Sequence, residues 1–446
     1  MAEEVVITGI GMITPLGDTA STTWDNLLNH KICAEPIPEH WKEYTDYNSE
    51  IWSPLPQIDY TSRGIGRREK LQYDTVQLLG MAAAQEALLD AGLSTAQKEE
   101  GSSAFRLNPQ RAGVVMGTGS GGITSVISAQ ANHTFTPVKK GLEFFPAPQE
   151  QLDKIHRIGR LMNSPARYNP FVVSMMMPNA CSSSIGIRFG LTGHNETCCF
   201  ACASGTAALG HAYGMIKSGR LDCALSGGAE YLGDRYGGVF RSFDAAGTLV
   251  RGDAPRKHCP FDENRSGFLF SEGGAAVLVL ESLEHARKRN APIIARISGF
   301  KERFDPLSAM NMEPSGSCIK EMLKETLDSS EIKPSQVEYI NSHGTGTVVN
   351  DEVEALVIDD VFGRNTPVNS TKSLLGHTLG ACGAVEAAVT ALSIRNSRTH
   401  GFPFLHKPLR NLAYIKESRS LDIRYALSQS FAFGGHNAVL LLERYA

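Results

Sequence analysis

The chain has 446 residues, of which 42% are hydrophobic and 20% charged, so it can bury a large core and favours more than one structural unit. The net charge of −4 argues against a generally basic nucleic-acid-binding protein. No apolar run reaches the ~18 residues of a membrane-spanning helix, and the start MAEEVVITG has no signal-peptide pattern, so we expect a cytoplasmic protein without membrane insertion. The nine scattered cysteines favour reduced thiols over a disulfide framework.

The first half of the chain alternates short apolar segments with glycine turns and helical patterns. It begins with the strand VVITGIG at Val5 and continues with AGVVMGTGSGG, TCCFACASGTAALGHAYGMIKSG, CALSGGAE and AAVLVLES. Apolar runs of this kind, bounded by turns and separated by helical patterns, predict buried strands with helices on both faces of the sheet. The predicted fold class is therefore α/β.

The second half repeats this plan in the same order. Its segments are PIIARISGF, VEYINSHGTGT, TPVNSTKSLLGHTLGACGAVEAAVTALSIRN, RYALSQSFAFGGHNA and VLLLERY. Such self-similarity predicts two related α/β halves, which we divide into residues 1–283 and 284–446 at the charged segment SLEHARKRNAP. The stretch of about 132–169 is rich in Pro, Lys and Arg and is expected to be an insertion in the first half.

The first motif that contains a candidate catalytic residue is ACASG, which includes Cys202. Here an apolar strand ends at a cysteine and small residues open a helix. The N–H groups and the positive dipole end of a helix N-terminus are expected to lower the pKa of a thiol and to hold an oxyanion. An isolated cysteine is more often a buried core residue, so the assignment of Cys202 as a nucleophile depends on the other motifs.

Two histidines stand in similar glycine-rich settings. His343 lies in NSHGTGT and His377 in STKSLLGHTLGACGAVE, each near the end of an apolar strand. A single histidine is usually a structural residue, but two in matching settings favour a shared site. The segment SFAFGGHNA from Ser430 supplies a further glycine turn that can bring backbone N–H groups to the same point.

In this order and spacing the motifs resemble those of the β-ketoacyl-acyl-carrier-protein synthases, chiefly the elongating synthase II type and the related stand-alone ketosynthases of type II polyketide pathways. The similarity runs from VVITGIGMITPLG to the last strand. It implies the thiolase fold, with two pseudo-symmetric βαβαβαββ halves in five αβαβα layers. It also implies a homodimer, or a heterodimer with a related ketosynthase-like subunit, that works on acyl carrier protein. No cofactor or metal is expected, because the carrier protein brings the phosphopantetheine.

The resemblance also implies roles for the central residues. Cys202 would hold the acyl group as a thioester, with an oxyanion hole formed by the N–H groups of Cys202 and Phe433. His343 and His377 would stabilise the enolate formed when malonyl-acyl-carrier-protein loses carbon dioxide. The product of this decarboxylative Claisen condensation is a 3-oxoacyl-acyl-carrier-protein. Lys372 would order the site, with Glu386 as its ionic partner.

Other residues are expected to bind the substrate or its carrier. By the resemblance, Thr345 and Thr347 bond the pantetheine, Phe433 is a gate, and Phe243 and Phe431 belong to the acyl pocket. A basic cluster in TSRGIGRREK is expected to dock the acidic carrier protein; its members are Arg63, Arg67, Arg68 and Lys70.

The chain departs from the family pattern at three positions. Ala432 and His436 replace the first glycine and the threonine of the usual GFGGTN, which leads us to expect reduced backbone freedom at the gate. Cys382 stands where alanine is common.

Four alternatives remain from the sequence. A chain-length partner subunit of a polyketide ketosynthase would keep the fold but usually lacks the nucleophile. A thiolase dependent on coenzyme A would need another catalytic cysteine near the C-terminus, where this chain has FGGHN. A GxGxxG at Gly117 could hold a dinucleotide, but the expected acidic residue is missing. The CxxC formed by Cys199 and Cys202 could be a redox pair or half of a zinc site.

Overall fold

The computed structural model describes residues 3–43, 45–94, 105–131, 148–151, 153, 169–252, 258–402 and 404–445. Most of the expected insertion at 132–169 lies outside these residues.

The strands of the first half form one side of a large sheet. They are β1 (Val5–Ile13), β6 (Ala112–Gly117), β7 (Asn195–Cys198), β8 (Cys223–Tyr231) and β9 (Gly273–Ser282). Their spatial order is β7-β6-β8-β9-β1. The first three are parallel, whereas β9 is antiparallel to both β8 and β1.

The second half repeats this topology. Its main strands are β10 (Ala295–Phe304), β11 (Tyr339–Asn341), β12 (Pro367–Asn369), β16 (Tyr425–Phe431) and β17 (His436–Glu443). Their order β12-β11-β16-β17-β10 again runs third, second, fourth, fifth, first in chain order, with the same parallel and antiparallel pairings. The short β14 (Ala413–Tyr414) is added beside β12.

The two halves meet at their first strands. β1 and β10 pair antiparallel through Val5 and Ile297, which joins all these strands into one sheet of eleven. Each of the two strands carries a register shift at the matching place, between Ile7 and Gly9 in β1 and between Ile297 and Gly299 in β10. The internal repeat predicted from the sequence therefore includes even the register shifts of the first strand of each half.

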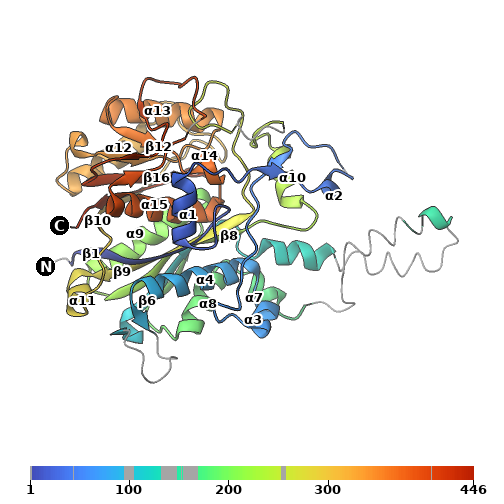
Figure 1. Ribbon diagram of the computed structural model, residues 1–446, viewed down its shortest axis with the longest axis horizontal. Coiled ribbons are helices and arrows are strands. Elements are labelled where there is room, and N and C mark those ends of the chain that lie inside the picture. The colour runs from blue at the N-terminus through green and yellow to red at the C-terminus, as the bar shows by residue number, and fades with distance from the viewer. Residues whose placement is uncertain are drawn as a thin grey trace.

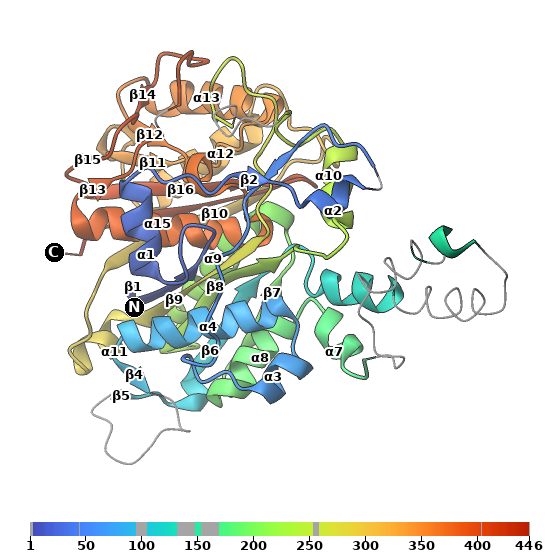
Figure 2. The same cartoon turned by 45° about the vertical axis from the view of Figure 1, so that its right-hand side comes forward.

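Helices lie between and outside the two halves of the sheet (Figures 1 and 2). The central layer contains α9 (Ser204–Lys217) and α15 (Cys382–Asn396). The outer layers contain α4 (Thr75–Asp90) and α8 (Ala180–Phe189) on the first half, and α12 (Ser317–Ser329) and α13 (Val348–Phe362) on the second. The predicted arrangement of five layers is thus confirmed.

Shorter elements complete the described part of the chain. The remaining α-helices are α1 (Ala20–Leu28), α2 (Glu39–Lys42), α3 (Arg67–Gln72), α7 (Val172–Met176), α10 (Gly238–Ala245), α11 (Leu283–Lys288) and α14 (Lys372–Leu375). The short strand pairs are β2 (Glu35–Pro36) with β3 (Ile51–Trp52), β4 (Leu93–Ser94) with β5 (Phe105–Arg106), and β13 (Arg398–Thr399) with β15 (Arg419–Ser420). None of the helices in the described ranges is long and apolar enough to cross a membrane.

The two central helices are rich in small residues because they lie between the two halves of the sheet. Every residue of α15 from Cys382 to Ile394 is buried, as expected for a helix that meets a sheet on each face. Where α9 passes α15, a Cβ at Gly205 would lie 2.6 Å from the backbone nitrogen of Ala384. Glycine at this position lets the N-terminal ends of both helices come together.

A buried carboxylate ties the first glycine turn to the second half. Glu230, at 0% exposure, accepts hydrogen bonds from the N–H groups of Gly119 at 2.6 Å, Ser120 at 3.1 Å and Gly380 at 3.1 Å. Burial raises the pKa of this carboxyl to about 7 against these hydrogen bonds. The turn that resembles a dinucleotide-binding loop thus donates its amides to the protein's own carboxylate, which argues against a phosphate there.

We expect Glu230→Gln to destabilise the fold, because the amide nitrogen would face backbone N–H groups that then lack an acceptor. A buried unsatisfied donor costs about 1–3 kcal/mol, so the urea midpoint should fall clearly below that of the parent. The control is Glu284→Gln in α11, whose side chain is 63% exposed. Equal midpoints for both variants would show that the three amides do not depend on the carboxylate.

Candidate active site

The sequence ACASG forms a sharp bend that exposes one thiol to a cavity. A 3-10 turn, Ala201–Ala203, precedes α9, and Ala201 has a φ of 47°, a left-handed conformation that is uncommon for a residue with a side chain. The other half has a matching bend, where Leu379 has a φ of 46° just before Gly380. Of these two related bends, only the first carries a cysteine, Cys202, which is 4% exposed.

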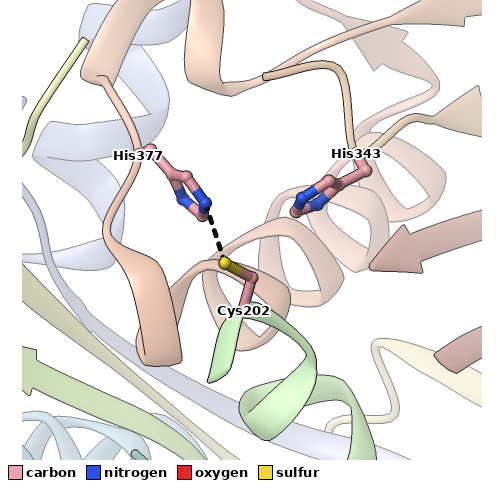
Figure 3. Close-up of side chains that lie close together, drawn as sticks. All are labelled: Cys202, His343 and His377. Carbon is pink, nitrogen blue, oxygen red and sulfur yellow. Dashed lines mark hydrogen bonds between the residues drawn. The ribbon is translucent and has the colours of Figure 1, made fainter. Parts of the chain in front are cut away.

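His377 lies directly against this thiol. Its Nε2 is 3.1 Å from the Sγ of Cys202 (Figure 3). The backbone N–H of Leu379 donates a hydrogen bond to the Nδ1 of His377 at 3.2 Å, so Nδ1 must be the unprotonated nitrogen of the neutral ring. The hydrogen of the ring therefore lies on Nε2 and points at the sulfur.

His343 also carries its ring hydrogen on Nε2, but here a side chain and not a backbone N–H fixes the tautomer. The ammonium group of Lys372 lies 3.2 Å from the Nδ1 of His343 and also donates to its backbone carbonyl at 2.8 Å. An ammonium group can only donate, so Nδ1 accepts and Nε2 carries the hydrogen. The rings of His343 and His377 are 5.5 Å apart and nearly perpendicular, and both lie beside Cys202 (Figure 3).

Both imidazoles are neutral in this environment. Burial and the positive charge of Lys372 hold the pKa of each ring well below its usual value. Lys372 itself is 1% exposed and forms an ion pair with the buried carboxylate of Glu386. Burial alone would lower the pKa of Lys372, but the carboxylate of Glu386 keeps it raised. The site thus presents two neutral Nε2–H donors, one oriented by the ammonium group of Lys372 and the other by the backbone N–H of Leu379.

The pKa of Cys202 corrects one expectation. Burial raises the pKa of this thiol to about 12, although Lys372 and the backbone N–H of Phe433 lower it. The predicted lowering of the pKa at the helix start is wrong, because desolvation of a thiolate in the closed site outweighs these contributions. In the unliganded protein, Cys202 is therefore a thiol.

Two buried carboxylates of α13 shape the loop of the HGTGT motif. Glu354 accepts the N–H groups of His343 and Gly344, both at 2.7 Å, and burial raises the pKa of Glu354 to about 8. Asp351 accepts the N–H group of Thr345 at 3.1 Å. These hydrogen bonds fix the backbone that carries the first histidine.

A cavity of about 310 Å³ opens onto the thiol. Seven of the site residues predicted from the sequence line this cavity: Cys202, His343, His377, Thr345, Thr347, Phe431 and Phe433. Phe243 does not line it: its ring packs against Phe268, 5.7 Å away, and Phe268 in turn lies edge-on to His377 at 5.2 Å. Phe268, Met310 and Met312 also line the cavity. These three residues could not be recognised from the sequence, because single apolar residues in a loop carry no periodic signal.

The departures from the usual gate motif have structural explanations. Ala432 is not among the residues with positive φ, whereas Gly434 and Gly435 have φ values of 82° and 81°, so alanine is accommodated without strain. His436 stacks on Phe200 with a centroid distance of 4.5 Å and an interplanar angle of 4°. The Sγ of Cys382 lies 3.3 Å from the carbonyl oxygen of Cys202.

Two models of known families match the chain. The β-ketoacyl synthase N-terminal domain matches residues 2–286, and the β-ketoacyl synthase C-terminal domain matches residues 294–403. The chain belongs to the β-ketoacyl synthase family. This membership confirms the resemblance found in the sequence.

Curated relatives and solved structures agree. The chain is 32% identical over 452 residues to the 3-oxoacyl-[acyl-carrier-protein] synthase 2 of Staphylococcus aureus strain COL, covering 99% of each chain. It is 32% identical over 448 residues to the protein of the same name from Coxiella burnetii, covering 99% of this chain and 98% of the relative. A crystal structure of a β-ketoacyl synthase from Burkholderia phymatum matches with a TM-score of 0.83, 29% identity and 100% coverage of both chains. The ishigamide ketosynthase/chain length factor matches with a TM-score of 0.83, 25% identity and the same coverage. The predicted thiolase fold is thereby confirmed.

The basic cluster of this β-ketoacyl synthase divides into two kinds of residue. Arg63 has a side chain only 13% exposed and lies 3.6 Å from Asp18, so it is engaged within the fold. Arg67, Arg68 and Lys70 are exposed on α3. Lys70 lies over the ring of Tyr60 at 5.6 Å.

The alkylation of Cys202 by iodoacetamide should accelerate steadily as the pH rises between about 6 and 9. Only the thiolate reacts, and a pKa of about 12 means that its population grows throughout this range. The measurement is the rate of labelling of the Cys202 peptide by mass spectrometry, with Cys202→Ala as the control for labelling at the exposed Cys199. A rate that levels off below about pH 7 would contradict a neutral thiol.

Proposed function

We propose that this β-ketoacyl synthase condenses an acyl group, held as a thioester on Cys202, with malonyl-acyl-carrier-protein in fatty acid or type II polyketide chain elongation. The observation that carries the proposal is the convergence of two neutral Nε2–H donors, on His343 and His377, beside one buried thiol. The curated relatives are named for the synthesis of 3-oxoacyl-acyl-carrier-protein.

In the first half-reaction the sulfur of Cys202 attacks the thioester of an acyl carrier protein. The sulfur–carbon bond forms, the carrier thiol leaves, and the proton of Cys202 ends on that thiol. The N–H groups of Cys202 and Phe433 are proposed to hold the oxyanion of the tetrahedral intermediate. The N–H of Phe433 already points at the sulfur.

In the second half-reaction the malonyl group loses carbon dioxide, and the electron pair of the broken bond forms an enolate. The oxygen of this enolate is proposed to accept hydrogen bonds from His343 and His377. Neutral donors suit this task, because they stabilise the charge without transferring a proton to the carbon that must attack. That carbon attacks the acyl group on Cys202, which gives 3-oxoacyl-acyl-carrier-protein, carbon dioxide and, after one proton is taken up, the free thiol.

Further residues are proposed to guide the substrate. Thr345 and Thr347, whose hydroxyl groups are 2.8 Å apart, would bond the pantetheine. Phe433 would act as the gate and Phe431 as part of the acyl pocket. Phe243 would support that pocket from behind Phe268.

The partner is proposed to be acyl carrier protein, and the enzyme is proposed to act as a homodimer. A heterodimer is the alternative suggested by the ketosynthase/chain length factor that shares this fold. The chain itself is not proposed to be a non-condensing chain-length subunit, because it keeps Cys202, Lys372 and both histidines. A thiolase is disfavoured by the absence of a cysteine in the segment FGGHN.

The two half-reactions should separate in variants. Cys202→Ala should form no acyl-enzyme, whereas His343→Ala and His377→Ala should still be acylated but lose condensation by about 10²-fold or more, as when one oxyanion donor is removed. The defects should be non-additive, because both donors serve one charge. Intact mass and release of carbon dioxide report the two steps. Release at the parental rate from both histidine variants would refute their role.

Docking should depend on the exposed arginines of α3. Arg67→Glu combined with Arg68→Glu should slow turnover with acyl carrier protein, and salt should slow the parent more than the variant. A short acyl-pantetheine surrogate should react nearly as before. The control is Arg364→Glu with Arg424→Glu, two arginines of other regions with side chains 62% and 63% exposed. An equal loss with both substrates would indicate a structural role for α3.

A further inference from the structure

A cluster of side chains that can ligate a metal ion lies where β7 faces α9, and it shares no residue with the cluster of Cys202, His343 and His377. Glu196 and Cys198 are two positions apart on β7, so their side chains leave the same face of the strand. His211 approaches them from α9. Carboxylate oxygen, thiolate sulfur and imidazole nitrogen together are the donor set that Zn²⁺ prefers.

The distances within this cluster are close to those of a tetrahedral site. Zn²⁺ bonds to sulfur at about 2.3 Å and to nitrogen or oxygen at about 2.0–2.2 Å, so its ligand atoms are roughly 3.3–3.7 Å apart. The Sγ of Cys198 is 3.5 Å from the Nδ1 of His211 and 3.9 Å from the Oε1 of Glu196. The 2.7 Å between His211 Nδ1 and Glu196 Oε1 is a hydrogen bond, which must lengthen when a metal replaces the proton.

The surroundings orient two of the three donors. The other nitrogen of His211, Nε2, lies 3.4 Å from the carboxylate of Glu302 on β10. The second oxygen of Glu196, Oε2, lies 2.9 Å from the Nε2 of His194. A carboxylate behind a ligating histidine and a hydrogen bond to a ligating carboxylate are the outer contacts found around protein metal sites.

We propose that Glu196, Cys198 and His211 form a Zn²⁺ site with water as the fourth ligand. Binding releases the proton of the Cys198 thiol and the proton on Nδ1 of His211, so the ion would be held by a thiolate, a neutral imidazole and a carboxylate. The site would fasten β7 to α9 and, through Glu302, to β10 of the second half. These ligands differ from the CxxC of Cys199 and Cys202, the half-site suggested by the sequence, in a chain from which no metal was expected.

The test must exclude the active site, because Cys202, His343 and His377 also lie within ligand distance of one another. Titrations therefore use the Cys202→Ala protein with Co²⁺ as a spectroscopic probe, followed by displacement with Zn²⁺. We expect an absorption band from thiolate-to-cobalt charge transfer that Zn²⁺ abolishes. The band should be lost in Cys202→Ala/Cys198→Ala and should remain in Cys202→Ala/Cys199→Ala, which removes the exposed neighbouring cysteine.

A second pair of variants keeps the test decisive if Cys198→Ala folds poorly. In the Cys202→Ala background, Glu302→Gln should weaken Zn²⁺ binding about 10-fold or more, as expected for an outer contact of a ligating histidine. Glu321→Gln, an exposed glutamate on α12, should leave it unchanged. The proposal is overturned if the Cys202→Ala protein shows no thiolate-to-cobalt band with excess Co²⁺, or if the band survives Cys198→Ala.

Discussion

The arrangement of the site depends on hydrogen bonds at the Nδ1 atoms of two buried imidazoles, those of His343 and His377. Lys372 occupies the Nδ1 of His343, and the N–H of Leu379 occupies the Nδ1 of His377, so both rings must present Nε2–H towards Cys202. Burial keeps both rings neutral. If either Nδ1 contact were lost, the ring could adopt the other tautomer and would then offer a lone pair where the proposed condensation requires a donor.

The internal repeat explains how one fold positions such different groups. The bends at Ala201 and Leu379 are equivalent places in the two halves, with φ values of 47° and 46°, and both precede a central helix. In the first half the bend presents the thiol of Cys202. In the second half it presents backbone N–H groups, one of which binds His377 while the N–H of Gly380 binds Glu230. The same local geometry thus supplies the proposed nucleophile in the first half and positioning N–H groups in the second.

The surroundings of the site show which sequence departures matter. Ala432 occupies a backbone conformation open to any residue, so its difference from glycine carries no strain. His436 exchanges a small side chain for a ring that stacks on Phe200, the residue immediately before the bend at Ala201. This contact connects the glycine turn after Phe433 to the segment that leads from β7 to Cys202, the same segment that begins beside the proposed metal ligands.

The sequence by itself determined the α/β class and the repeat, and it selected Cys202, His343, His377 and Lys372 as candidate site residues, because glycine turns, apolar periodicity and motif spacing are local properties. It could not determine the raised pKa of Cys202, since desolvation depends on how completely the rest of the chain closes over the thiol. The sequence also did not show that Phe243 lies behind Phe268 or that Arg63 is engaged within the fold. Nor did it show that His211 contacts Glu196 and Cys198. These facts were decided only by the tertiary structure, because each depends on side chains from separate elements whose distances are fixed by packing.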